Sequence, residues 1–513
     1  MSSGLIWLAI GVYLVIALAT AWAARSGASS DMSAYFLGGR RMGGMVSALS
    51  YSATTYSAFM LVGLAGLTYA GGIGAFGFEI VYFAGVSLIS VFGPRFWAAG
   101  RRYGFVTPSE MLGHRYQSWA VSVVVTLTSC LFLIPYAAVQ LAGVGYLLSG
   151  MTDGAISFTT GTVVATALAV VFTWISGIRS VMWTDALQAA FMIVAATLVA
   201  IVVVKALGGF GTLFATLARD HPQALAVPGS GRFTLLTFVG LTMPWFFFSL
   251  SNPQVSQRLF MPASLTAMRR LILGFMVFGL IYTLVAVIWG LAAIVAFPDL
   301  ASADQATPTL LGSDFVPPVL AVIVMVGILA AAVSTIDSIM LTLSSMLARD
   351  VYANRRTTVS ERTQLKVGQW VIPVIALAAF VFAQLRLDLI VVLSVAASAG
   401  LVVVVPAIIG AFFWRRGTAA GVLSSVTITG LGVLVSEVSG VDFFGLPTGV
   451  WGLPMSTLIF VGVSLATLAP TSVAEAFMAC ANGDRSKVSD TPNPATPTLG
   501  VDRTTRRERV ERT

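Results

Sequence analysis

An apolar stretch in the second half of the chain reads Leu329-Ala-Ala-Ala-Val-Ser-Thr-Ile-Asp-Ser-Ile-Met-Leu-Thr342. It lies within residues 316–346, a run long enough to cross a membrane, and it groups a carboxylate with hydroxyls at Ser334, Thr335, Asp337 and Ser338. A charge at membrane depth costs at least about 2.5 to 3.5 kcal/mol on insertion scales, so it usually faces a partner, a cavity or an ion. Hydroxyl and carboxylate oxygens are hard ligands that suit alkali cations. The stretch therefore predicts a membrane-embedded polar or ion site.

The composition is that of a membrane protein. Of the 513 residues, 57% are hydrophobic and 10% are charged, whereas soluble domains are about 25% charged. Apolar runs of about 20 residues, enough to cross a hydrocarbon core of about 30 Å, recur along the chain. We expect an all-α polytopic membrane protein with about thirteen transmembrane helices. The expected spans are residues 4–24, 45–70, 75–98, 119–149, 156–177, 183–205, 233–251, 271–297, 316–346, 367–385, 389–413, 418–438 and 450–470.

Few residues support enzyme chemistry. Cys130 and Cys480 are the only cysteines, one in an expected span and one in the tail, which argues against a disulfide framework or a cysteine metal site. His114 and His221 lie in expected loops, and no nucleophile or base pairs with them. The Gly-rich runs lie in apolar spans, where helix packing explains them better than phosphate binding. We therefore expect neither an enzyme nor a bound cofactor.

The basic residues predict the orientation of the chain. Outside the tail, most Lys and Arg residues, Arg258 among them, fall in loops on one face of the expected topology. Because cytoplasmic loops carry an excess of Lys and Arg, this sorting places the N-terminus outside and the C-terminus in the cytoplasm. It also accounts for the net charge of +8 without a nucleic-acid partner. The first apolar run has no Lys or Arg ahead of it, so we expect a retained helix rather than a signal peptide.

The end of the chain differs from the rest. Residues 1–470 form the expected transmembrane domain, and residues 471–513 contain a Pro-rich segment, 490–497, followed by a basic one, 503–509. With little apolar content to bury, residues 471–513 are predicted to form a disordered cytoplasmic tail.

Two expected spans carry interruptions, and a binding site at membrane depth requires them because a broken helix frees backbone carbonyls and helix ends. Residues 50–57 read Ser-Tyr-Ser-Ala-Thr-Thr-Tyr-Ser, a poor continuous helix. The alternative is that these hydroxyls bond back to the preceding turn or pack between helices. Pro253 marks the second break and places Asn252 and Gln254 beside the aromatic run 245–248, although a cytoplasmic helix end would read the same way.

Three separated segments resemble motifs of the sodium:solute symporter family, in the expected order and spacing. They are Tyr35-Phe-Leu-Gly-Gly-Arg-Arg-Met-Gly43, Ser176-Gly-Ile-Arg-Ser-Val-Met-Trp-Thr-Asp-Ala-Leu-Gln188 and Ser334-Thr-Ile-Asp-Ser338. The resemblance covers roughly residues 5–465, and the pattern at 48–66 is most similar to the proline permease branch. It implies a LeuT-type core of five plus five helices in inverted repeats. The repeats would be residues about 45–205 and 233–413, with extra helices at 4–24, 418–438 and 450–470.

The resemblance implies a sodium site between the broken second span and the ninth span. The family's ligands match backbone oxygens of Ala53 and Tyr56, together with Ala331, Ser334 and Thr335. Asp185 matches a family acid linked to sodium passage or to a further sodium site, which in some members also involves the positions of Asp337 and Ser338. The sequence leaves open whether a second ion binds.

The solute is expected against the broken second span and the segment around Pro253. The candidates are Ser52, Thr54, Thr55, Glu79, Trp245, Ser249, Asn252 and Gln254. Positions matching Glu79 and Asn252 contact sugar in some family members, but Glu79 also suits a helix start. The proline branch has an aspartate in place of Thr55 and an aromatic hydroxyl in place of Ser249, which weakens a proline assignment. No Lys or Arg is expected deep in a span to bind an anionic solute.

The family resemblance implies sodium-coupled uptake of a small organic solute across the cell membrane by alternating access. The expected partners are the solute, Na+ as coupling ion and the lipid bilayer. One alternative is a proton-coupled carrier, because Asp185, Asp337 and Glu79 are buried acids that could titrate. Another is a membrane sensor with a transporter fold. The sequence does not choose among amino acids, monocarboxylates, pantothenate-like acids and sugars, and it leaves the oligomeric state undetermined.

Overall fold

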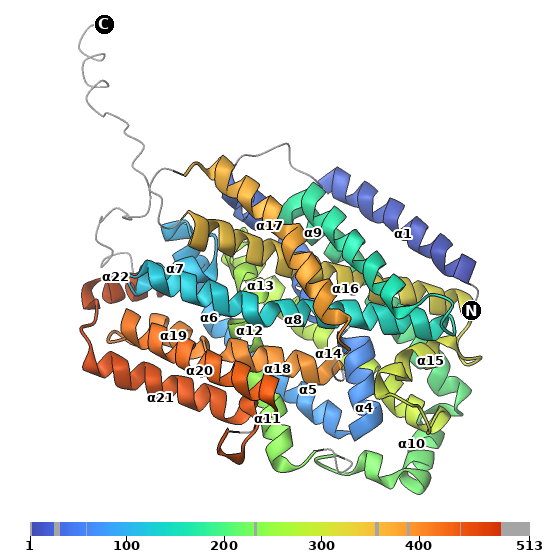
Figure 1. Ribbon diagram of the computed structural model, residues 1–513. Helices are drawn as coiled ribbons and strands as arrows, with labels where there is room; N and C mark the ends of the chain where they lie inside the picture. Colours follow the sequence, from blue (N-terminus) through green and yellow to red (C-terminus); the bar gives the residue numbers. More distant parts are fainter. Residues whose placement is uncertain are drawn as a thin grey trace, which may run out of the picture.

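A computed structural model of the chain describes residues 3–24, 31–57, 59–229, 233–353, 359–386, 390–441 and 443–483. These residues form a bundle of helices joined by short turns, and none of them belongs to a β-strand (Figure 1). Many large side chains on the outside of the bundle are apolar, including Trp7, Leu198, Trp370 and Leu458. An apolar exterior of this extent marks a surface that lies against lipid.

The bundle is built from long helices and short connecting ones. The longer helices are α1 (Ser3–Ala24), α3 (Gly44–Thr55), α4 (Ala65–Gly71), α5 (Gly74–Gly85), α6 (Ser87–Tyr103), α8 (Trp119–Met151), α9 (Phe158–Ala206), α11 (Leu235–Phe246), α14 (Leu265–Ala296), α16 (Pro318–Met346), α17 (Glu361–Ala383), α18 (Ile390–Val402), α19 (Val405–Phe413), α20 (Ala419–Ser439) and α21 (Thr448–Ala466). The connecting helices are α2 (Met32–Leu37), η1 (Gly38–Arg40), η2 (Phe59–Leu64), α7 (Pro108–Arg115), α10 (Gly209–Asp220), η3 (Pro222–Leu225), α12 (Phe248–Ser251), α13 (Pro253–Ser256), η4 (Gln257–Phe260), η5 (Ala303–Gln305), α15 (Ala306–Gly312), η6 (Leu347–Tyr352), η7 (Phe443–Gly445) and α22 (Thr471–Ala481).

The helices agree with a multi-pass membrane protein. Among the described residues, nine helices are long and apolar enough to cross a membrane, or ten if the bent pair α18 and α19 forms one span. Three of the other expected spans contain only shorter apolar helices, Phe59–Gly71, Phe158–Trp174 and Leu235–Phe246, because breaks divide them. The total of about thirteen crossings stays a prediction.

The fifth and sixth expected spans are continuous in α9, which is kinked at Gly177. This glycine has φ 59° and ψ 175°, a combination that side-chain-bearing residues rarely adopt. A Cβ at this position would also lie 3.0 Å from the ring of Tyr35. The kink comes about two turns before Asp185, so it helps to set the direction in which that part of α9 approaches its neighbours.

Helix α16 is the most enclosed of the described helices that are long enough to cross a membrane. Its side chains from Gly327 to Met346 are all buried, and it contacts α9, α3 and α13. Both interrupted spans meet it, because α3 ends at Thr55 and the segment of α11, α12 and α13 bends at Asn252. The two breaks therefore bring backbone ends to the helix that carries Ser334 and Thr335.

The short helices α7 and α22 lie together at one end of the bundle, and α10 lies at the other (Figure 1). The prediction that the tail is disordered from residue 471 is wrong for Thr471–Ala481, which forms α22. This helix is held by Phe477, whose ring packs against Tyr103 at 6.0 Å and Phe412 at 5.4 Å. A few apolar residues at helical spacing thus fix this segment despite the polar tail that follows it. Residues 484–513, where the rest of that prediction falls, lie outside the described residues.

Candidate functional site

The second expected span is broken between α3 and η2. Tyr56 leaves the helical conformation with φ −94° and ψ 75°, so carbonyls of the last turn of α3 are freed from helical bonding. The hydroxyls of Ser52 and Thr55 donate to Ala48 O and Tyr51 O, each at 2.8 Å. For residues 50–57, the alternative interpretation was that the hydroxyls bond back to the preceding helical turn. Two of the hydroxyls do so. These two solute candidates direct their hydroxyls into their own helix.

Thr335 on α16 faces the end of α3. Its hydroxyl oxygen lies 3.3 Å from Ala53 O, 3.2 Å from Thr54 O and 3.1 Å from Ala331 O. A hydroxyl has a single proton, so it cannot fully satisfy three carbonyl oxygens at once. A set of neutral oxygens gathered from two helices is suited to a hard cation. We call these four residues the Thr335 oxygen cluster.

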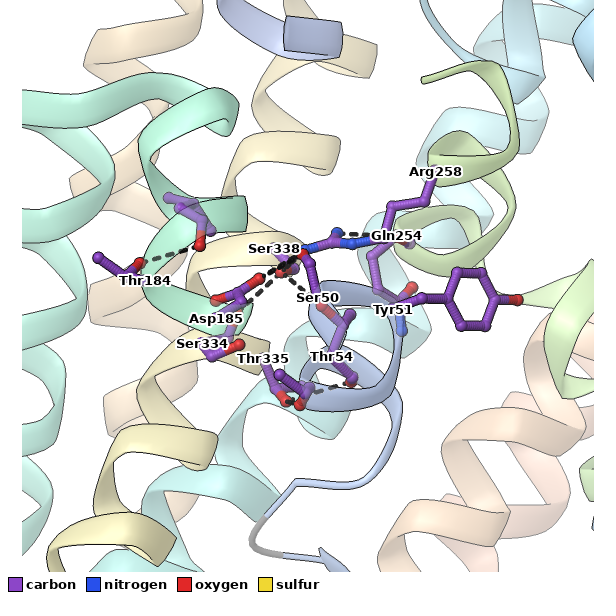
Figure 2. A network of polar contacts seen from close by, with 12 residues as sticks. Ser50, Tyr51, Thr54, Thr184, Asp185, Gln254, Arg258, Ser334, Thr335 and Ser338 are labelled. Atoms are coloured by element: carbon purple, nitrogen blue, oxygen red, sulfur yellow. Dashed lines mark hydrogen bonds and ion pairs between the residues drawn. The ribbon is translucent and has the colours of Figure 1, made fainter. Parts of the chain in front are cut away.

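The remaining predicted sodium ligands lie next to this cluster. Ser334 Oγ is buried and makes no hydrogen bond of good geometry, and Figure 2 shows it between Asp185 and Thr335. The ring of Tyr56 stacks on Phe275 at 5.2 Å, and the carbonyls that face the Thr335 hydroxyl are those of Ala53, Thr54 and Ala331 rather than that of Tyr56. The structure thus brings Ala53, Ala331 and Thr335 together and adds Thr54, which the sequence had assigned to the solute.

A buried ion pair lies beside the oxygen cluster. Arg258 Nη2 donates to Asp185 Oδ2 at 3.0 Å, and the two side chains are 2% and 1% exposed. The same nitrogen donates to Ser338 Oγ at 2.8 Å and to Ser50 Oγ at 3.3 Å, and Ser50 donates to Asp185 Oδ2 at 2.8 Å. Figure 2 shows these side chains converging from η4, α9, α16 and α3. We call these four residues the Arg258 cluster.

Thr54 connects the two clusters. Its hydroxyl oxygen lies 3.1 Å from Ser338 Oγ, and its carbonyl faces the Thr335 hydroxyl. Ser338 also donates to Ser334 O at 2.8 Å. Because Thr335 and Ser338 are three residues apart on α16, they lie on the same side of that helix. The two clusters are therefore neighbours on α3 and α16.

The position of Arg258 corrects two expectations. The sequence placed this arginine in a loop on the basic face and predicted no Lys or Arg deep in the bundle, whereas the structure buries it in the core. Pro253 ends the apolar run that a hydropathy window detects, and the short helices α13 and η4 that follow keep the chain inside the bundle. One signal was present: residues 245–257 carry no charge, and the apolar Leu259 and Phe260 follow the arginine.

Asp337 takes part in a different contact. Its Oδ1 accepts a hydrogen bond from Thr173 Oγ1 at 2.9 Å, and the hydroxyl of Tyr35 donates to the carbonyl of Thr173 at 3.2 Å. Adjacent residues of a helix point about 100° apart, so Asp337 and Ser338 meet different neighbours. Of the second-ion candidates, Asp185 and Ser338 are in one cluster and Asp337 is bonded to the first half of α9.

A group of buried polar atoms that make no hydrogen bond of good geometry lies around Trp245. It comprises both carboxylate oxygens of Glu79, Trp245 Nε1 and the hydroxyls of Tyr82 and Tyr136. The indole lies beside the Glu79 carboxylate, and its ring centroid is 5.9 Å from that of Tyr82. The rings of Tyr82 and Tyr136 both pack on Phe248. Since buried polar groups normally have partners, these four residues, which we call the Glu79 group, form the candidate solute site.

The other solute candidates differ in whether their side chains make hydrogen bonds. Ser249 Oγ is buried without a hydrogen bond. Asn252 Nδ2 donates to Ser251 Oγ at 3.1 Å, and Gln254 Nε2 donates to Asn252 Oδ1 at 3.4 Å. The two amides are fully buried, which disagrees with a solvated cytoplasmic helix end at this position.

The histidine of α7 takes no part in these clusters. Burial lowers the pKa of His114, and its ring packs against Tyr103 at 4.6 Å and Phe105 at 5.3 Å. It is therefore a packing residue of the end of the bundle where α7 lies.

Known sequences resemble this chain over most of its length. The family model described as the sodium:solute symporter family matches residues 35–430. A sodium/pantothenate symporter of Escherichia coli (strain K12) is 28% identical over 446 residues, which are 85% of this chain and 91% of that protein. A sodium/proline symporter of Staphylococcus aureus (strain NCTC 8325 / PS 47) is 25% identical over 496 residues, which are 91% and 94% of the two chains.

Solved structures resemble the fold. A Na+-coupled sialic acid symporter in a substrate-bound outward-open state has a TM-score of 0.76 and 20% identity, with 90% of this chain and 98% of that chain covered. The nucleobase-cation-symport-1 family transporter Mhp1 in a closed conformation has a TM-score of 0.56 and 13% identity, with 87% and 98% covered. At such identities the likeness concerns the fold, and it confirms the predicted all-α, LeuT-type architecture.

Proposed function

The chain belongs to the sodium:solute symporter family, as a sodium-coupled membrane transporter of a small organic solute and not an enzyme, and we propose that its sodium ion binds at the Thr335 oxygen cluster. The proposed ligands are the carbonyls of Ala53, Tyr56 and Ala331 and the hydroxyls of Ser334 and Thr335. The observation that carries this proposal is the approach of three carbonyl oxygens to a single hydroxyl.

The chemistry of the cluster favours sodium over a proton as the coupling ion. Carbonyl and hydroxyl oxygens coordinate a hard cation but do not take up a proton near neutral pH. Asp337 and Glu79 offer carboxylates elsewhere, but neither contacts the Thr335 hydroxyl among the described hydrogen bonds. A sodium ion at the cluster would hold the end of α3 against α16.

We propose that sodium and solute act through this junction. α3 and α16 belong to the two different predicted repeats, so an ion between them favours one arrangement of the repeats over the other. If the solute binds best to that same arrangement, sodium raises the affinity for solute by the factor by which solute raises the affinity for sodium. Rocking of the repeats then exposes both sites to the cytoplasm, and inward transport follows the sodium gradient and the membrane potential, which contributes about 2.3 kcal/mol per charge per 100 mV.

The Glu79 group is the proposed solute site. Its carboxylate lies beside the Trp245 indole, and the ring of Tyr82 packs next to that indole. Aromatic rings attract a cation over their faces, and an ionised carboxylate in the core is stabilised by a paired positive charge. A solute with a positively charged nitrogen satisfies both, so we propose a small amino acid or a related zwitterion rather than a pantothenate-like anion.

Uptake into proteoliposomes tests the proposal. The full-length chain is offered L-proline, other amino acids, pantothenate and glucose, each with an inward sodium gradient and with potassium in its place. We expect sodium-driven accumulation of a zwitterion, and in Thr335→Ala and Ser334→Ala we expect it to require a sodium concentration at least about tenfold higher. Ser344→Ala is the matched control, because this buried hydroxyl of α16 bonds only to Leu341 O of its own helix. Uptake that does not depend on sodium, or that is unchanged by both substitutions, would contradict the proposed sodium site.

We also propose an external N-terminus and a cytoplasmic C-terminus. Gln117 before α8 and Asp153 after it are exposed and lie at opposite ends of that helix. Each would be replaced by Cys in a chain whose native cysteines are Ser. A membrane-impermeant maleimide should label Asp153→Cys in intact cells and Gln117→Cys only after permeabilisation, and the reverse pattern would contradict this orientation.

A further inference from the structure

Helix α1 is attached to the rest of the bundle along a narrow stripe. Its buried side chains recur every three or four positions, and they are Ile6, Ile10, Tyr13, Ala17 and Ala21. Residues at this spacing lie on one face of a helix, and α1 contacts α9 and α16. Figure 1 shows α1 at the edge of the bundle, beside α9. Only part of α1 is therefore covered by protein, and the remainder lies against the membrane.

An apolar groove lies beside this stripe and has a volume of about 450 Å³. Ligand pockets in proteins have volumes of about 300–1,000 Å³, so the groove is large enough for a bound molecule. Its walls come from three helices, and they are formed by residues within 5–20 of α1, 184–191 of α9 and 322–330 of α16. We call it the α1 groove.

The polar side chains that line the α1 groove bond to the protein itself. Thr20 and Thr184 donate to carbonyls of their own helices, at 2.9 Å in both cases. Gln188 Nε2 donates to the hydroxyl oxygen of Tyr13 at 3.0 Å. The other lining residues are apolar or glycine, so the groove offers a ligand hydrocarbon contacts rather than charge.

The dimensions of the α1 groove fit one hydrocarbon chain. Leu5 and Thr20 are 15 positions apart in α1, which corresponds to about 22 Å at 1.5 Å per residue. A volume of about 450 Å³ over this length gives a mean cross-section of roughly 20 Å². Since carbon atoms of neighbouring chains pack about 3.5–4.0 Å apart, this cross-section admits a single chain. A helix, at about 10–12 Å across with its side chains, is too wide.

The α1 groove opens onto the surface that faces lipid. Leu8 and Ile16 of α1 and Leu187 and Phe191 of α9 line it and are 50–65% exposed. They belong to segments that are long and apolar enough to cross a membrane, residues 4–24 and 177–206. A molecule therefore enters the groove sideways from the hydrocarbon core of the bilayer, where the chains available are the acyl chains of lipids.

The inner wall of the α1 groove adjoins both polar clusters. On α9, Thr184 lines the groove and is followed by Asp185 of the Arg258 cluster. On α16, Ala330 lines the groove and is followed by Ala331 of the Thr335 oxygen cluster. A chain in the groove therefore packs against the helices that carry both clusters.

We propose that the α1 groove binds one acyl chain of a membrane phospholipid, and that this chain stabilises the packing of α1 against α9 and α16. Inside a membrane the gain comes from van der Waals contacts, because the surroundings of a free chain are also hydrocarbon. None of the lining residues belongs to the proposed sodium and solute sites, so the lipid site and the transport mechanism are tested separately.

Photolabelling of the full-length chain in phosphatidylcholine vesicles tests the proposal. A small proportion of the lipid carries a diazirine in one acyl chain, and labelled residues are identified by mass spectrometry. Val12 lines the groove, whereas Val15, about one turn further along α1, is exposed and is not among the lining residues. We expect several-fold more label on Val12 than on Val15. Equal labelling of the two valines would indicate ordinary lipid contact and overturn the proposal.

Filling the groove provides a second measurement. Val12→Trp places a large side chain in the groove, and Val15→Trp, the matched control, places it in lipid. Val12 is 52% exposed and lies outside the buried stripe, so α1 should keep its position in the variant. We expect Val12→Trp to lower the label on Val326, in the α16 wall, several-fold and Val15→Trp to leave it unchanged. Undiminished label on Val326 in Val12→Trp would overturn the proposal.

Thermal unfolding measures the stabilisation. Delipidated protein in detergent and potassium buffer, without solute, should unfold at a higher temperature as phosphatidylcholine is added, because a ligand of the folded state stabilises it. The rise should be smaller in Val12→Trp than in Val15→Trp, since the filled groove no longer admits a chain. Equal rises in the two variants would show that the added lipid acts elsewhere, and the proposed stabilisation would be wrong.

Discussion

The Thr335 oxygen cluster and the Arg258 cluster lie side by side on α3 and α16, and both gather oxygens from several helices. They differ in charge. The Thr335 oxygen cluster consists of neutral oxygens, whereas the Arg258 cluster holds a carboxylate together with its own counter-ion. In the proposed function the first takes a sodium ion from solution, whereas the carboxylate of the second already has Arg258 as its counter-ion.

The difference in charge shows how two neighbouring polar clusters can serve different purposes, one as an ion site and the other as a structural ion pair. A dissociable ion that is held by neutral oxygens can enter and leave during transport. A guanidinium on a side chain is part of the protein and cannot leave as an ion does. The predictions below break one cluster while leaving the other in place, from the largest expected effect to the smallest.

The largest effect should follow removal of one partner of the ion pair. Asp185→Asn leaves the Arg258 charge buried without its carboxylate, which typically costs about 3–5 kcal/mol. We expect a large drop in the thermal unfolding temperature of the detergent-purified chain. The double variant Asp185→Asn/Arg258→Gln should unfold at a higher temperature than Asp185→Asn alone, because no buried charge is left unpaired. If the double variant is no more stable than the single one, the two charges do not compensate each other.

Removal of the Thr335 hydroxyl should act on sodium more than on stability. In Thr335→Ala we expect the sodium concentration for half-maximal uptake to rise at least about tenfold, equivalent to about 1.4 kcal/mol. In sodium-free buffer, loss of one neutral hydrogen bond should cost only about 1 kcal/mol. Sodium titration of uptake measures the first effect and thermal unfolding in potassium the second. Ser344→Ala should change neither, and an equal loss in that control would remove the distinction.

Neutralising the carboxylate of the Glu79 group should affect the solute and spare the ion. A charged hydrogen bond contributes about 1.5–3 kcal/mol, so Glu79→Gln should raise the half-saturating concentration of a zwitterionic solute by about 10- to 150-fold. Sodium binding measured without solute should remain unchanged. A parallel loss of both would show that Glu79 serves the ion site.

The smallest effects are expected at Ser52 and Thr55. Their hydroxyls already bond to Ala48 O and Tyr51 O within α3, so neither is available to an ion or a solute. Ser52→Ala and Thr55→Ala should each change the sodium affinity of uptake by less than about twofold and stability by about 1 kcal/mol or less. A tenfold change in either would mean that the hydroxyl leaves its helical acceptor during transport.

The sequence predicted well those features that depend on local patterns. Hydropathy located helices at every expected span, and the break at residues 50–57 follows from a run of hydroxyl residues that make a poor helix. The resemblance to the family predicted that Ala53, Ala331 and Thr335 belong to one site, and the structure places these three residues in contact. Their role as sodium ligands stays a prediction.

Other features could not be predicted in this way. Thr54 was chosen for the solute because of its hydroxyl, but its carbonyl is what faces Thr335. Asp337 and Ser338 were grouped because they are adjacent, although helix geometry turns them to different neighbours, Thr173 and Arg258. The location of Arg258 depends on the path of two short helices, α13 and η4, that begin at Pro253, and no hydropathy window resolves this path.

The sequence by itself therefore determined that this chain crosses the membrane many times, where its helices are interrupted and which family motifs it carries. The tertiary structure alone decided which polar groups meet and which of them bring their own charge. The physical reason is the distance along the sequence between the residues that interact. Helix formation and membrane insertion depend on residues within about two turns or one span, whereas the contact of Thr335 with Ala53 joins positions 282 residues apart and the pair of Arg258 with Asp185 joins positions 73 apart.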